Sequence, residues 1–251
     1  MPLAEHQTLL RLDRLSKRFG DRLAVEDLSL EIAPGEIYGL IGPNGSGKTT
    51  TVKMITGLYR PTTGRVLVDG MDLQAEPVRV KRLLGYIPDE PFVYEKMTGR
   101  EFLQLVGQLY GVFAPERARR IEELLDLFSL GGIADEYAQN YSRGNRQKFA
   151  ILASLLHAPR LLIVDEPVVG LDPESIIRTR DLLVAFAGRG GGALICTHTL
   201  TFAEQVCDRI GLLKEGRLIR EGGLPALRAV AQRPDASLEE LYLYFNKTGP
   251  P

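Results

Sequence analysis

The stretch Gly42–Thr50, GPNGSGKTT, limits what this chain can fold into more than any other part of it. It contains the pattern G-x-x-x-x-G-K-T, follows the apolar run Ile37–Ile41 and precedes Thr50–Leu58, which has helical spacing. A strand, a glycine-rich turn and a helix are the setting in which this pattern binds phosphate. Its three glycines let successive backbone N–H groups point inward and form, with the helix N-terminus, a nest for an anion. We therefore expect a phosphate-binding loop; the alternative is a glycine-rich turn that binds nothing.

Two side chains of the loop have specific expected roles. Lys48 would place its ammonium on the β- and γ-phosphates of a nucleotide, and the Thr49 hydroxyl would bind Mg²⁺. We expect the loop and the start of the helix to supply the nucleotide-binding residues, which are Gly42, Pro43, Asn44, Gly45, Ser46, Gly47, Lys48, Thr49 and Thr50.

A second apolar run ends in two acidic residues. Leu161–Val164 leads directly into Asp165 and Glu166, and we expect a central strand beside the phosphate-loop strand, with its carboxyl end at the same crevice. Asp165 would hold Mg²⁺ through its water shell, and Glu166 would orient the attacking water or accept its proton. Alone, such a strand end is often only solvated; together with the loop it predicts a hydrolytic site.

Bulk properties narrow the function classes. The 251 residues suffice for one large domain or two small ones. A net charge of −1 gives no basic field that would recruit nucleic acid, and no run reaches the roughly 18–20 apolar residues of a membrane-spanning helix. The N-terminal stretch lacks a signal-peptide core. Cys196 and Cys207 suit neither a metal site nor a disulfide framework, so we expect core cysteines of a reduced, cytosolic protein.

Strand and helix patterns alternate in the first and last parts of the chain. Residues 8–33 indicate short strands around a polar turn at Lys17–Arg22. Pro173 suits the first position of a helix. From Gly222 onward we expect two short helices, the second beginning at the capping pattern Ser237-Leu238-Glu239-Glu240.

Helical spacing alone governs the middle of the chain. Four apolar residues fall at i, i+3, i+4 and i+7, namely Phe102, Leu105, Val106 and Leu109. The same spacing recurs from Ile121, and Ser142–His157 is a third helix candidate. We expect a wholly helical block from Asp89 to Ala158, inserted into the alternating chain. The alternative is a continuous α/β domain with long crossovers.

Taken in order, these motifs resemble those of the ATP-binding cassette of ABC transporters, over roughly Leu9 to Ile219. Gly42–Thr49 is similar to the Walker A loop, and Leu161–Glu166 is similar to the Walker B strand with its adjacent glutamate. Tyr141-Ser142-Arg143-Gly144-Asn145 stands in the place of the signature motif, normally LSGGQ.

Three further positions carry the resemblance. Phe19, in KRFG, matches the aromatic residue that stacks on adenine, although an aromatic before glycine is commonly a packing residue. Gly170-Leu171-Asp172 resembles the D-loop. His198, at the end of a strand, sits at the switch histidine of the family.

The resemblance implies an α/β fold. Its parts would be a RecA-like P-loop NTPase core with a mainly parallel sheet, an N-terminal antiparallel β region and an inserted α-helical subdomain. The cassette would span residues 1–221, with its core at 1–88 and 159–221 and the helical subdomain at about 89–158. Residues 222–251 would be a short helical extension that aids dimerisation or covers the core.

The resemblance also implies a mechanism that one chain cannot complete. Two cassettes of this family dimerise head to tail, so Ser142, Arg143, Gly144 and Asn145 would contact ATP on the opposite protomer. Asp172 would communicate across the interface. The chemistry of this site would be carried by Glu166 and His198. His198 would hold the γ-phosphate and the attacking water in register.

The same resemblance names cofactors and partners. ATP and Mg²⁺ would be the cofactors, with a second cassette, identical or paralogous, and a separate membrane permease as partners. The permease would hold this chain at the cytoplasmic face of the cell membrane. No nucleic acid is expected as a partner.

Three residues depart from the family pattern. Asp89 stands where the family usually has the Q-loop glutamine; it would offer Mg²⁺ an oxygen without an N–H donor, or serve as a turn residue after Pro88. Arg143 replaces the first signature glycine and would either form a local salt bridge or reach a phosphate. Asn145 replaces the signature glutamine. We expect ATP hydrolysis nonetheless, because the main positions are intact: Lys48, Asp165, Glu166 and His198.

The segment after Asp89 bears on the permease. In this family it forms the groove that receives a cytoplasmic helix of the membrane subunit, and here the candidate contacts are Phe92, Tyr94 and Glu95. The two aromatic residues would alternatively pack inward. The phrases DEPFVYEKMTGREFL and SLEELYLYF resemble the ATPase subunits of bacterial ABC-2-type exporters.

Two other functions compete with a transporter ATPase. A soluble ABC ATPase acting on ribosomes or DNA usually has two cassettes or a long coiled-coil insertion, and this chain has one Walker A pattern and no extended heptads. A phosphate-loop kinase of small molecules would not explain the helical block and the signature-like segment between Lys48 and Asp165.

Overall fold

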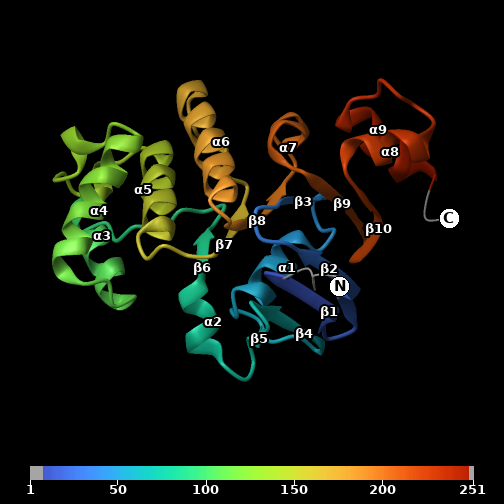
Figure 1. Ribbon diagram of the computed structural model, residues 1–251, viewed down its shortest axis with the longest axis horizontal. Coiled ribbons are helices and arrows are strands. Elements are labelled where there is room, and N and C mark those ends of the chain that lie inside the picture. The colour runs from blue at the N-terminus through green and yellow to red at the C-terminus, as the bar shows by residue number, and fades with distance from the viewer. Residues whose placement is uncertain (1–7, 249–251) are drawn as a thin grey trace, which may run out of the picture.

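A computed structural model describes residues 8–248, which form two sheets with helices around them (Figure 1). Residues 1–7 of the predicted cassette and 249–251 of the predicted extension lie outside the described part. The first sheet is antiparallel and has the order β2-β1-β4-β5. Its strands are β1 (Leu10–Phe19), β2 (Arg22–Ile32), β4 (Thr63–Val68) and β5 (Met71–Asp72).

The N-terminal strands are longer than the sequence pattern predicted. The residues from Lys17 onward, expected as a turn, continue β1, and Phe19 pairs directly with Arg22 across a turn of two residues. Register shifts interrupt the pairing, and Arg14 and Asp27 have left-handed backbones with φ of 47° and 48°. Such irregularities break the strict alternation of apolar and polar residues. The polar run is therefore the exposed end of a twisted ribbon.

The second sheet has six strands in the order β10-β9-β3-β8-β7-β6, and all neighbours except β9 and β10 run parallel. Its strands are β3 (Ile37–Ile41), β6 (Leu84–Ile87), β7 (Leu161–Asp165), β8 (Gly192–Thr197), β9 (Arg209–Lys214) and β10 (Arg217–Gly222). Strands β3, β7 and β8 are buried along their whole length, as their apolar sequences predict.

The order of these strands corrects one expectation. The strand that ends in Asp165 is central, but β8 lies between it and the phosphate-loop strand β3. An apolar run indicates burial on both faces, and it carries no information on which strand is the neighbour. The carboxyl ends of β3, β8 and β7 still meet at one edge, because the three strands are parallel.

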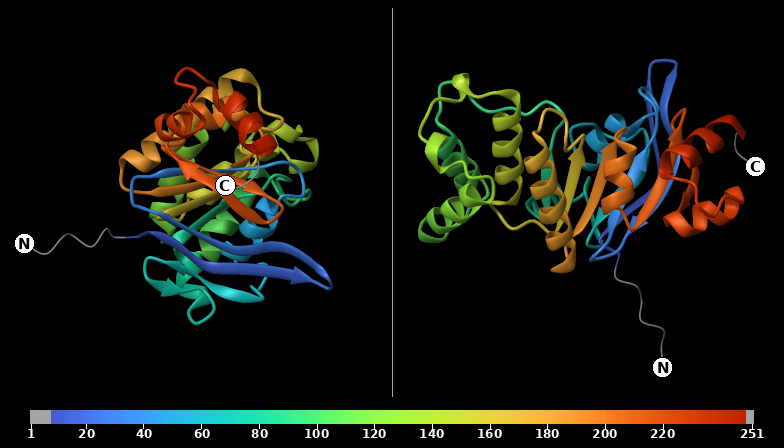
Figure 2. Two further views of the ribbon diagram at one scale, coloured as in Figure 1. Left: turned by 90° about the vertical axis from the view of Figure 1, so that its right-hand side faces the viewer. Right: turned by 90° about the horizontal axis from the view of Figure 1, so that it is seen from above.

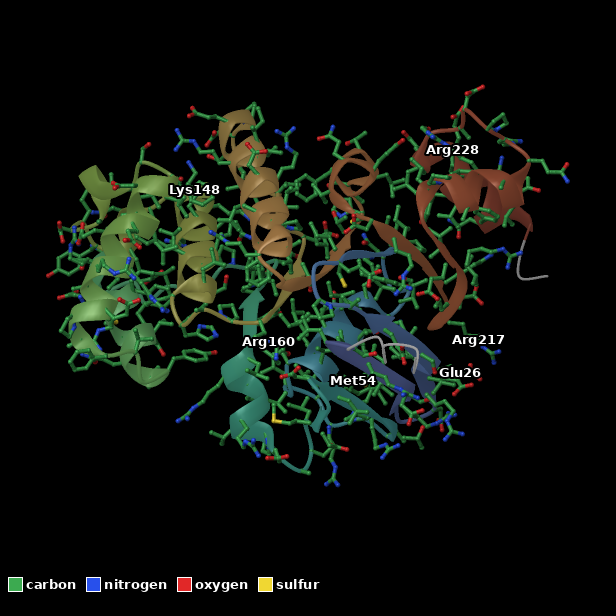
Figure 3. All side chains as sticks on the ribbon, in the orientation of Figure 1. Glu26, Met54, Lys148, Arg160, Arg217 and Arg228 are labelled. Atoms are coloured by element: carbon green, nitrogen blue, oxygen red, sulfur yellow. The ribbon has the colours of Figure 1, made fainter. Side chains whose placement is uncertain are left out.

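Helices cover both faces of the parallel sheet (Figure 1). Helices α6 (Pro173–Gly188) and α7 (Leu200–Val206) lie on one face, while α1 (Lys48–Ile55), α2 (Pro77–Leu83) and the antiparallel sheet lie on the other. The two sheets are also joined by side chains (Figure 3). Arg217 donates to Glu26 at 2.9 Å, and Arg160 pairs with Asp69.

The remaining helices of the middle segment gather at one end of the molecule (Figures 1 and 2). They are α3 (Gly99–Leu109), α4 (Ala114–Leu127), the short 3-10 helices η1 (Gly131–Ile133) and η2 (Ala138–Asn140), and α5 (Arg143–Leu155). The block is not wholly helical, because the chain from Pro88 to the capping residue Thr98 forms a loop rich in proline. Phe149 and Leu152 belong to the same apolar cluster as Val164 of the sheet.

The chain ends its described part in two helices, α8 (Leu224–Ala231) and α9 (Leu238–Thr248), as predicted. Ser237 and Glu240 form the expected cap, since the Ser237 N–H donates to the Glu240 carboxylate at 2.8 Å. Leu241 and Phe245 pack in a third apolar cluster with residues of α7 and β9. Among the helices of residues 8–248, none combines the length and apolar character needed to cross a membrane.

Candidate functional site

The predicted phosphate loop connects β3 to α1, and its glycines are required by close backbone approaches. A Cβ on Gly47, whose φ is 109°, would lie 2.6 Å from the carbonyl oxygen of Ala24. A Cβ on Gly42 would lie 2.3 Å from the carbonyl oxygen of Leu213. Gly47 caps α1 without a side chain, so the first N–H groups of the helix are left for an anion.

Lys48 lies inside the curve of this loop. Its Nζ donates to the carbonyl oxygens of Gly42 at 2.6 Å and Pro43 at 3.2 Å, and the residue is buried. In both contacts, backbone carbonyl oxygens of the loop hold the ammonium. A triphosphate would meet a positive charge that is already in place.

The acidic side of the site lies at the end of β7. Asp165 is buried, and this burial raises its pKa to about 6, while the negative charges of Glu166 and Asp89 act in the same direction. A hydrogen bond from Thr49 acts in the opposite direction and links Asp165 to the phosphate loop. A cation bound here would lower the pKa again.

The donor set fits Mg²⁺ only with help from phosphate. No group of three or more His, Cys, Asp or Glu side chains within residues 8–248 could hold a metal ion. Magnesium commonly uses one or two protein ligands together with substrate phosphates and water. Thr49 and Asp165 supply that kind of partial site beside the loop.

Glu166 is held by the end of β8. Its carboxylate accepts from the Thr197 hydroxyl at 2.8 Å and from the backbone N–H of His198 at 3.0 Å. The His198 Nδ1 lies 2.7 Å from the same carboxylate, so that nitrogen carries the proton. Glu166 also has a left-handed backbone with φ of 53°, which is strained for a residue with a Cβ.

The sequence did not lead us to predict Thr197 as a residue of the site. This residue is fully buried, and it fixes one oxygen of Glu166 while its own oxygen accepts from the Thr199 N–H at 3.0 Å. A signal existed, because Thr197 is a polar residue that ends an otherwise apolar run directly before His198. Buried hydroxyls normally have a hydrogen-bond partner, and here the partner is the predicted catalytic carboxylate.

One pocket of about 610 Å³ brings most of the predicted residues together. Its lining consists of Phe19, Arg22, Ala24, Asn44, Gly45, Gly47, Lys48, Thr49, Thr50, Asp89, Arg143, Asp165, Glu166, Val169 and His198. Phe19 is partly exposed at this pocket and makes an edge-to-face contact with Tyr59. A larger groove, about 890 Å³, lies between α4 and α6 and holds none of the predicted residues.

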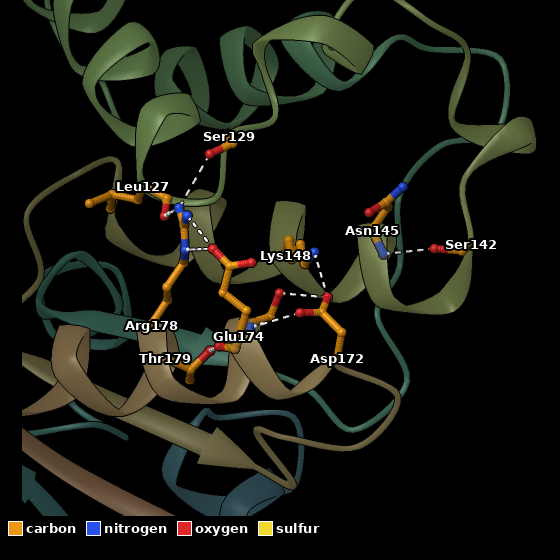
Figure 4. A network of polar contacts seen from close by, with 10 residues as sticks. Leu127, Ser129, Ser142, Asn145, Lys148, Asp172, Glu174, Arg178 and Thr179 are labelled. Carbon is orange, nitrogen blue, oxygen red and sulfur yellow. Dashed lines mark hydrogen bonds and ion pairs between the residues drawn. The ribbon is translucent and has the colours of Figure 1, made fainter.

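The signature-like segment caps α5 outside this lining, apart from Arg143 (Figure 4). The Ser142 hydroxyl accepts from the Asn145 N–H at 3.2 Å. Gly144 packs tightly on the D-loop, since a Cβ there would lie 2.7 Å from the Gly170 carbonyl oxygen. The segment therefore presents the N-terminus of α5 beside the D-loop of its own chain.

Asp172 is bound within its own chain. Its carboxylate caps α6 by accepting from the Ser175 N–H at 2.9 Å, and Lys148 of α5 donates to it at 3.0 Å (Figure 4). These contacts hold the pKa of Asp172 well below its usual range. Arg178 of the same helix donates to the Leu127 carbonyl oxygen at 2.7 Å, so α6 is tied to both α4 and α5.

In the structure Arg143 makes the local salt bridge, the first of its two alternatives. Its Nη2 lies 3.3 Å from Oδ1 of Asp89. The aromatic residues after Asp89 do not pack inward: Phe92 is 67% exposed and Tyr94 is 49% exposed. Their rings contact each other edge to face at 5.0 Å, and the Glu95 carbonyl oxygen accepts from Gln139.

Comparison with known proteins identifies the family. The ABC transporter family model matches residues 25–169. The daunorubicin resistance ATP-binding protein DrrA3 of Streptomyces coeruleorubidus is 36% identical over 222 residues, which cover 88% of this chain and 70% of the relative. The longer probable multidrug ABC transporter ATP-binding protein YbhF of Escherichia coli (strain K12) is 34% identical, and the matched region of this chain covers 41% of its length.

Solved structures agree. One described as the ATP-binding subunit of an ABC transporter superposes with a TM-score of 0.90 at 36% identity, covering 94% of this chain and 98% of that one. A dimeric ATP-binding cassette in a post-hydrolysis state, bound to ADP and Pi, gives 0.79 at 26% identity and covers 86% and 98%.

This chain belongs to the ABC transporter family. It is an ATP-binding cassette subunit, an ATPase whose hydrolysis of ATP drives transport. The family resemblance, the α/β fold class and the activity predicted from the sequence are confirmed, including the likeness to exporter ATPases.

Proposed function

We propose that this subunit powers export through a separately encoded membrane permease, by ATP-driven closure of a head-to-tail pair of cassettes. The observation that carries the proposal is the single pocket that joins Lys48, Asp165, Glu166 and His198. These residues come from the ends of the neighbouring strands β7 and β8 and from the loop after β3. Together they supply a cation for phosphate, a metal ligand and a group to orient water, the parts that phosphoryl transfer to water uses.

ATP binding uses the loop and the aromatic residue at its edge. Backbone N–H groups of the loop, those at the start of α1 among them, and the ammonium of Lys48 hold the phosphates, and Phe19 stacks on the adenine. Mg²⁺ would be held by Thr49 and, through water, by Asp165, with Asp89 as a further oxygen donor; it would neutralise charge on the β- and γ-phosphates. The Thr49–Asp165 hydrogen bond supports this pairing.

Water is oriented by the end of β8 and by Glu166. In the structure Thr197 and His198 hold the Glu166 carboxylate. We infer that Glu166 accepts the proton of the attacking water, and that His198 turns its ring toward the γ-phosphate when the pocket closes. Thr197 keeps the carboxylate in place during that change.

A second cassette completes the site. Ser142, Arg143, Gly144 and Asn145 with the N-terminus of α5 form the face that would cover ATP on the opposite protomer. Asp172 would carry the state of one site to the other through α5 and α6, since its carboxylate contacts Lys148 of α5 and Ser175 of α6. The dimeric cassette among the solved structures supports this pairing.

The permease would dock on the helical end. Phe92 and Tyr94 form an exposed aromatic pair on the loop after β6, with Glu95 beside them. Exposed aromatic residues of this kind commonly anchor an interface. This contact would place the chain at the inner face of the cell membrane. We propose residues 89–158 as the subdomain that carries it and 222–251 as a C-terminal extension, whose described helices α8 and α9 would cover the sheet.

The test separates binding from hydrolysis. Glu166→Gln keeps the shape of the carboxylate and removes the base, so turnover should fall by about 10²–10⁴-fold while ATP binding persists. ATPase activity and binding of a fluorescent ATP analogue would be measured on the same preparation. Turnover like that of the unmodified chain would contradict the assignment. As a matched control, Glu174→Gln on the outside of α6 should leave turnover unchanged.

A further inference from the structure

Arg143 is the first residue of α5, and its side chain reaches the nucleotide pocket of its own chain. There it pairs with Asp89 at 3.3 Å, and both side chains are about half exposed, 54% and 49%. The two residues lie 54 positions apart in the sequence and stand where the family has glutamine and glycine. The two residues that depart from the family pattern thus form one ion pair with each other.

An arginine at the N-terminus of α5 is stabilised by a carboxylate from outside the helix. The N-terminus of a helix carries a partial positive charge, so a cation there is unfavourable. Helix α5 has no acidic residue in its first turn that would offset it. Asp89 supplies the missing negative charge from the loop after β6.

The path of the arginine joins a third segment. Gly170, with φ of 80°, has no side chain where Arg143 passes, and a Cβ there would lie 3.3 Å from the Arg143 Cδ. The pair therefore lies across the Q-loop position, the signature helix and the D-loop at once.

Asp89 adds a negative charge to the pocket that we propose binds the phosphates of ATP. It shares that pocket with Asp165 and Glu166, and its charge contributes to the raised pKa of Asp165. Phosphate oxygens would be repelled by all three carboxylates. Family members with glutamine at this position avoid one of the three charges.

We propose that Arg143 is a positioning residue that acts through Asp89, offsetting this carboxylate in the pocket until Mg²⁺ takes over as its counter-charge. The proposal rests on the proposed function, because it takes the same pocket as the site of ATP and Mg²⁺. For the pocket of its own chain, it predicts that Arg143 matters for nucleotide binding only while Asp89 is charged and Mg²⁺ is absent; the contact with ATP on the opposite protomer is a separate role.

The test is a double-mutant cycle on nucleotide binding. A fluorescent, non-hydrolysable ATP analogue is titrated into the full chain in EDTA and in excess Mg²⁺, for Arg143→Gln, Asp89→Asn and the double variant. In EDTA, Arg143→Gln should weaken binding about 3- to 10-fold, because the unpaired carboxylate repels the phosphates. The loss should shrink to within about twofold in Mg²⁺, and also in EDTA when Asp89 is already Asn.

A matched ion pair serves as the control. Arg11 and Glu31 lie 3.4 Å apart in the antiparallel sheet, each 54% exposed, and neither lines the pocket. Arg11→Gln should therefore leave analogue binding unchanged in both buffers. Thermal unfolding of each variant in EDTA shows that it is folded.

Two results would overturn the inference. An equal loss with Asp89 and with Asn at position 89 would make Arg143 a direct phosphate ligand, and no loss in either background would make the pair a passive surface contact. If the unmodified chain does not bind the analogue even with Mg²⁺, the proposed function fails, and this inference fails with it.

Discussion

The nucleotide pocket has two walls that are built differently. The loop wall is the continuous segment Gly42–Thr50, for which we propose phosphate recognition by backbone N–H groups and by the buried ammonium of Lys48. The acidic wall consists of side chains at the ends of β6, β7 and β8: Asp89, Asp165, Glu166, Thr197 and His198, with Arg143 reaching over from α5.

The difference shows what each wall can tolerate. The loop wall depends on backbone torsion angles that only glycine adopts freely, so a single added methyl group disturbs all its donors together. The acidic wall depends on charge balance among separate segments, so one change can be offset by another, as Asp89 is offset by Arg143. We expect the variants below to have effects that follow this division.

The largest effect is expected in the loop wall. Gly47→Ala places a Cβ 2.6 Å from a backbone oxygen at a φ of 109°, which costs on the order of 3 kcal/mol and should weaken nucleotide binding about 100-fold. Gly190→Ala is the matched control, because its φ is 89° and nothing lies within 4 Å of the added Cβ. Analogue titration of both variants is the measurement. Equal binding would show that the loop wall is more adaptable than its geometry implies.

In the acidic wall, we expect the buried Asp165 carboxylate to lower the stability of the fold at neutral pH. The folded-state pKa of Asp165 is about 6 against an ordinary value of 3.8, so the folded chain retains a proton that the unfolded chain loses. The stability that this carboxyl contributes is therefore greatest below pH 3.8 and falls as the pH rises to about 6. Above that, the buried charge is a cost, and Asp165→Asn removes it.

The measurement is thermal unfolding of Asp165→Asn in EDTA across this pH range. At pH about 7.5 the variant should be more stable by about 1–3 kcal/mol, while the difference should vanish at pH about 3.5. Adding Mg²⁺ and ATP should stabilise the unmodified chain more than the variant, which keeps the loop wall and loses the Asp165 carboxylate. A variant that is less stable at every pH would contradict the picture of an uncompensated carboxylate.

A smaller effect is expected where a side chain positions another. Thr197→Val removes the hydrogen bond to Glu166, which is worth about 1.5–3 kcal/mol because the acceptor is charged, so turnover should fall about 10-fold or more. Analogue binding should stay the same, because the loop wall is untouched. Thr179→Val, a buried threonine bonded only along α6, controls for the loss of a buried hydroxyl. A change in analogue binding without a change in turnover would contradict this role, because Thr197 would then support the loop wall and not Glu166.

The two walls also differ in how well the sequence predicts them. The loop wall lies within nine consecutive residues, and its flanking strand and helix occur as expected, with α1 at Lys48–Ile55. Asp165, Glu166 and His198 were predicted as site residues because each stands at the end of an apolar strand, and the structure brings all three into one pocket. The pairing of Arg143 with Asp89 was left open, because residues 54 positions apart meet only in the folded chain.

Other misses have the same physical origin. The neighbour of β7 could not be read from its composition, since buried strands look alike from either side. Thr197 was overlooked because a hydroxyl in a strand is usually a packing residue, and only its partner Glu166 reveals its use. The polar end of β1 looked like a turn because bulges interrupt its alternation.

The position of α8 and α9 has a consequence for how the chain is made. Strand β10 is the edge of the six-stranded sheet, and Ile210 and Leu212 of the neighbouring β9 pack in one apolar cluster with Leu241 and Phe245 of α9. During synthesis these strands emerge before the helices that cover them. Until α9 has formed, the apolar residues that it covers are therefore exposed to non-native contacts, next to the edge strand β10.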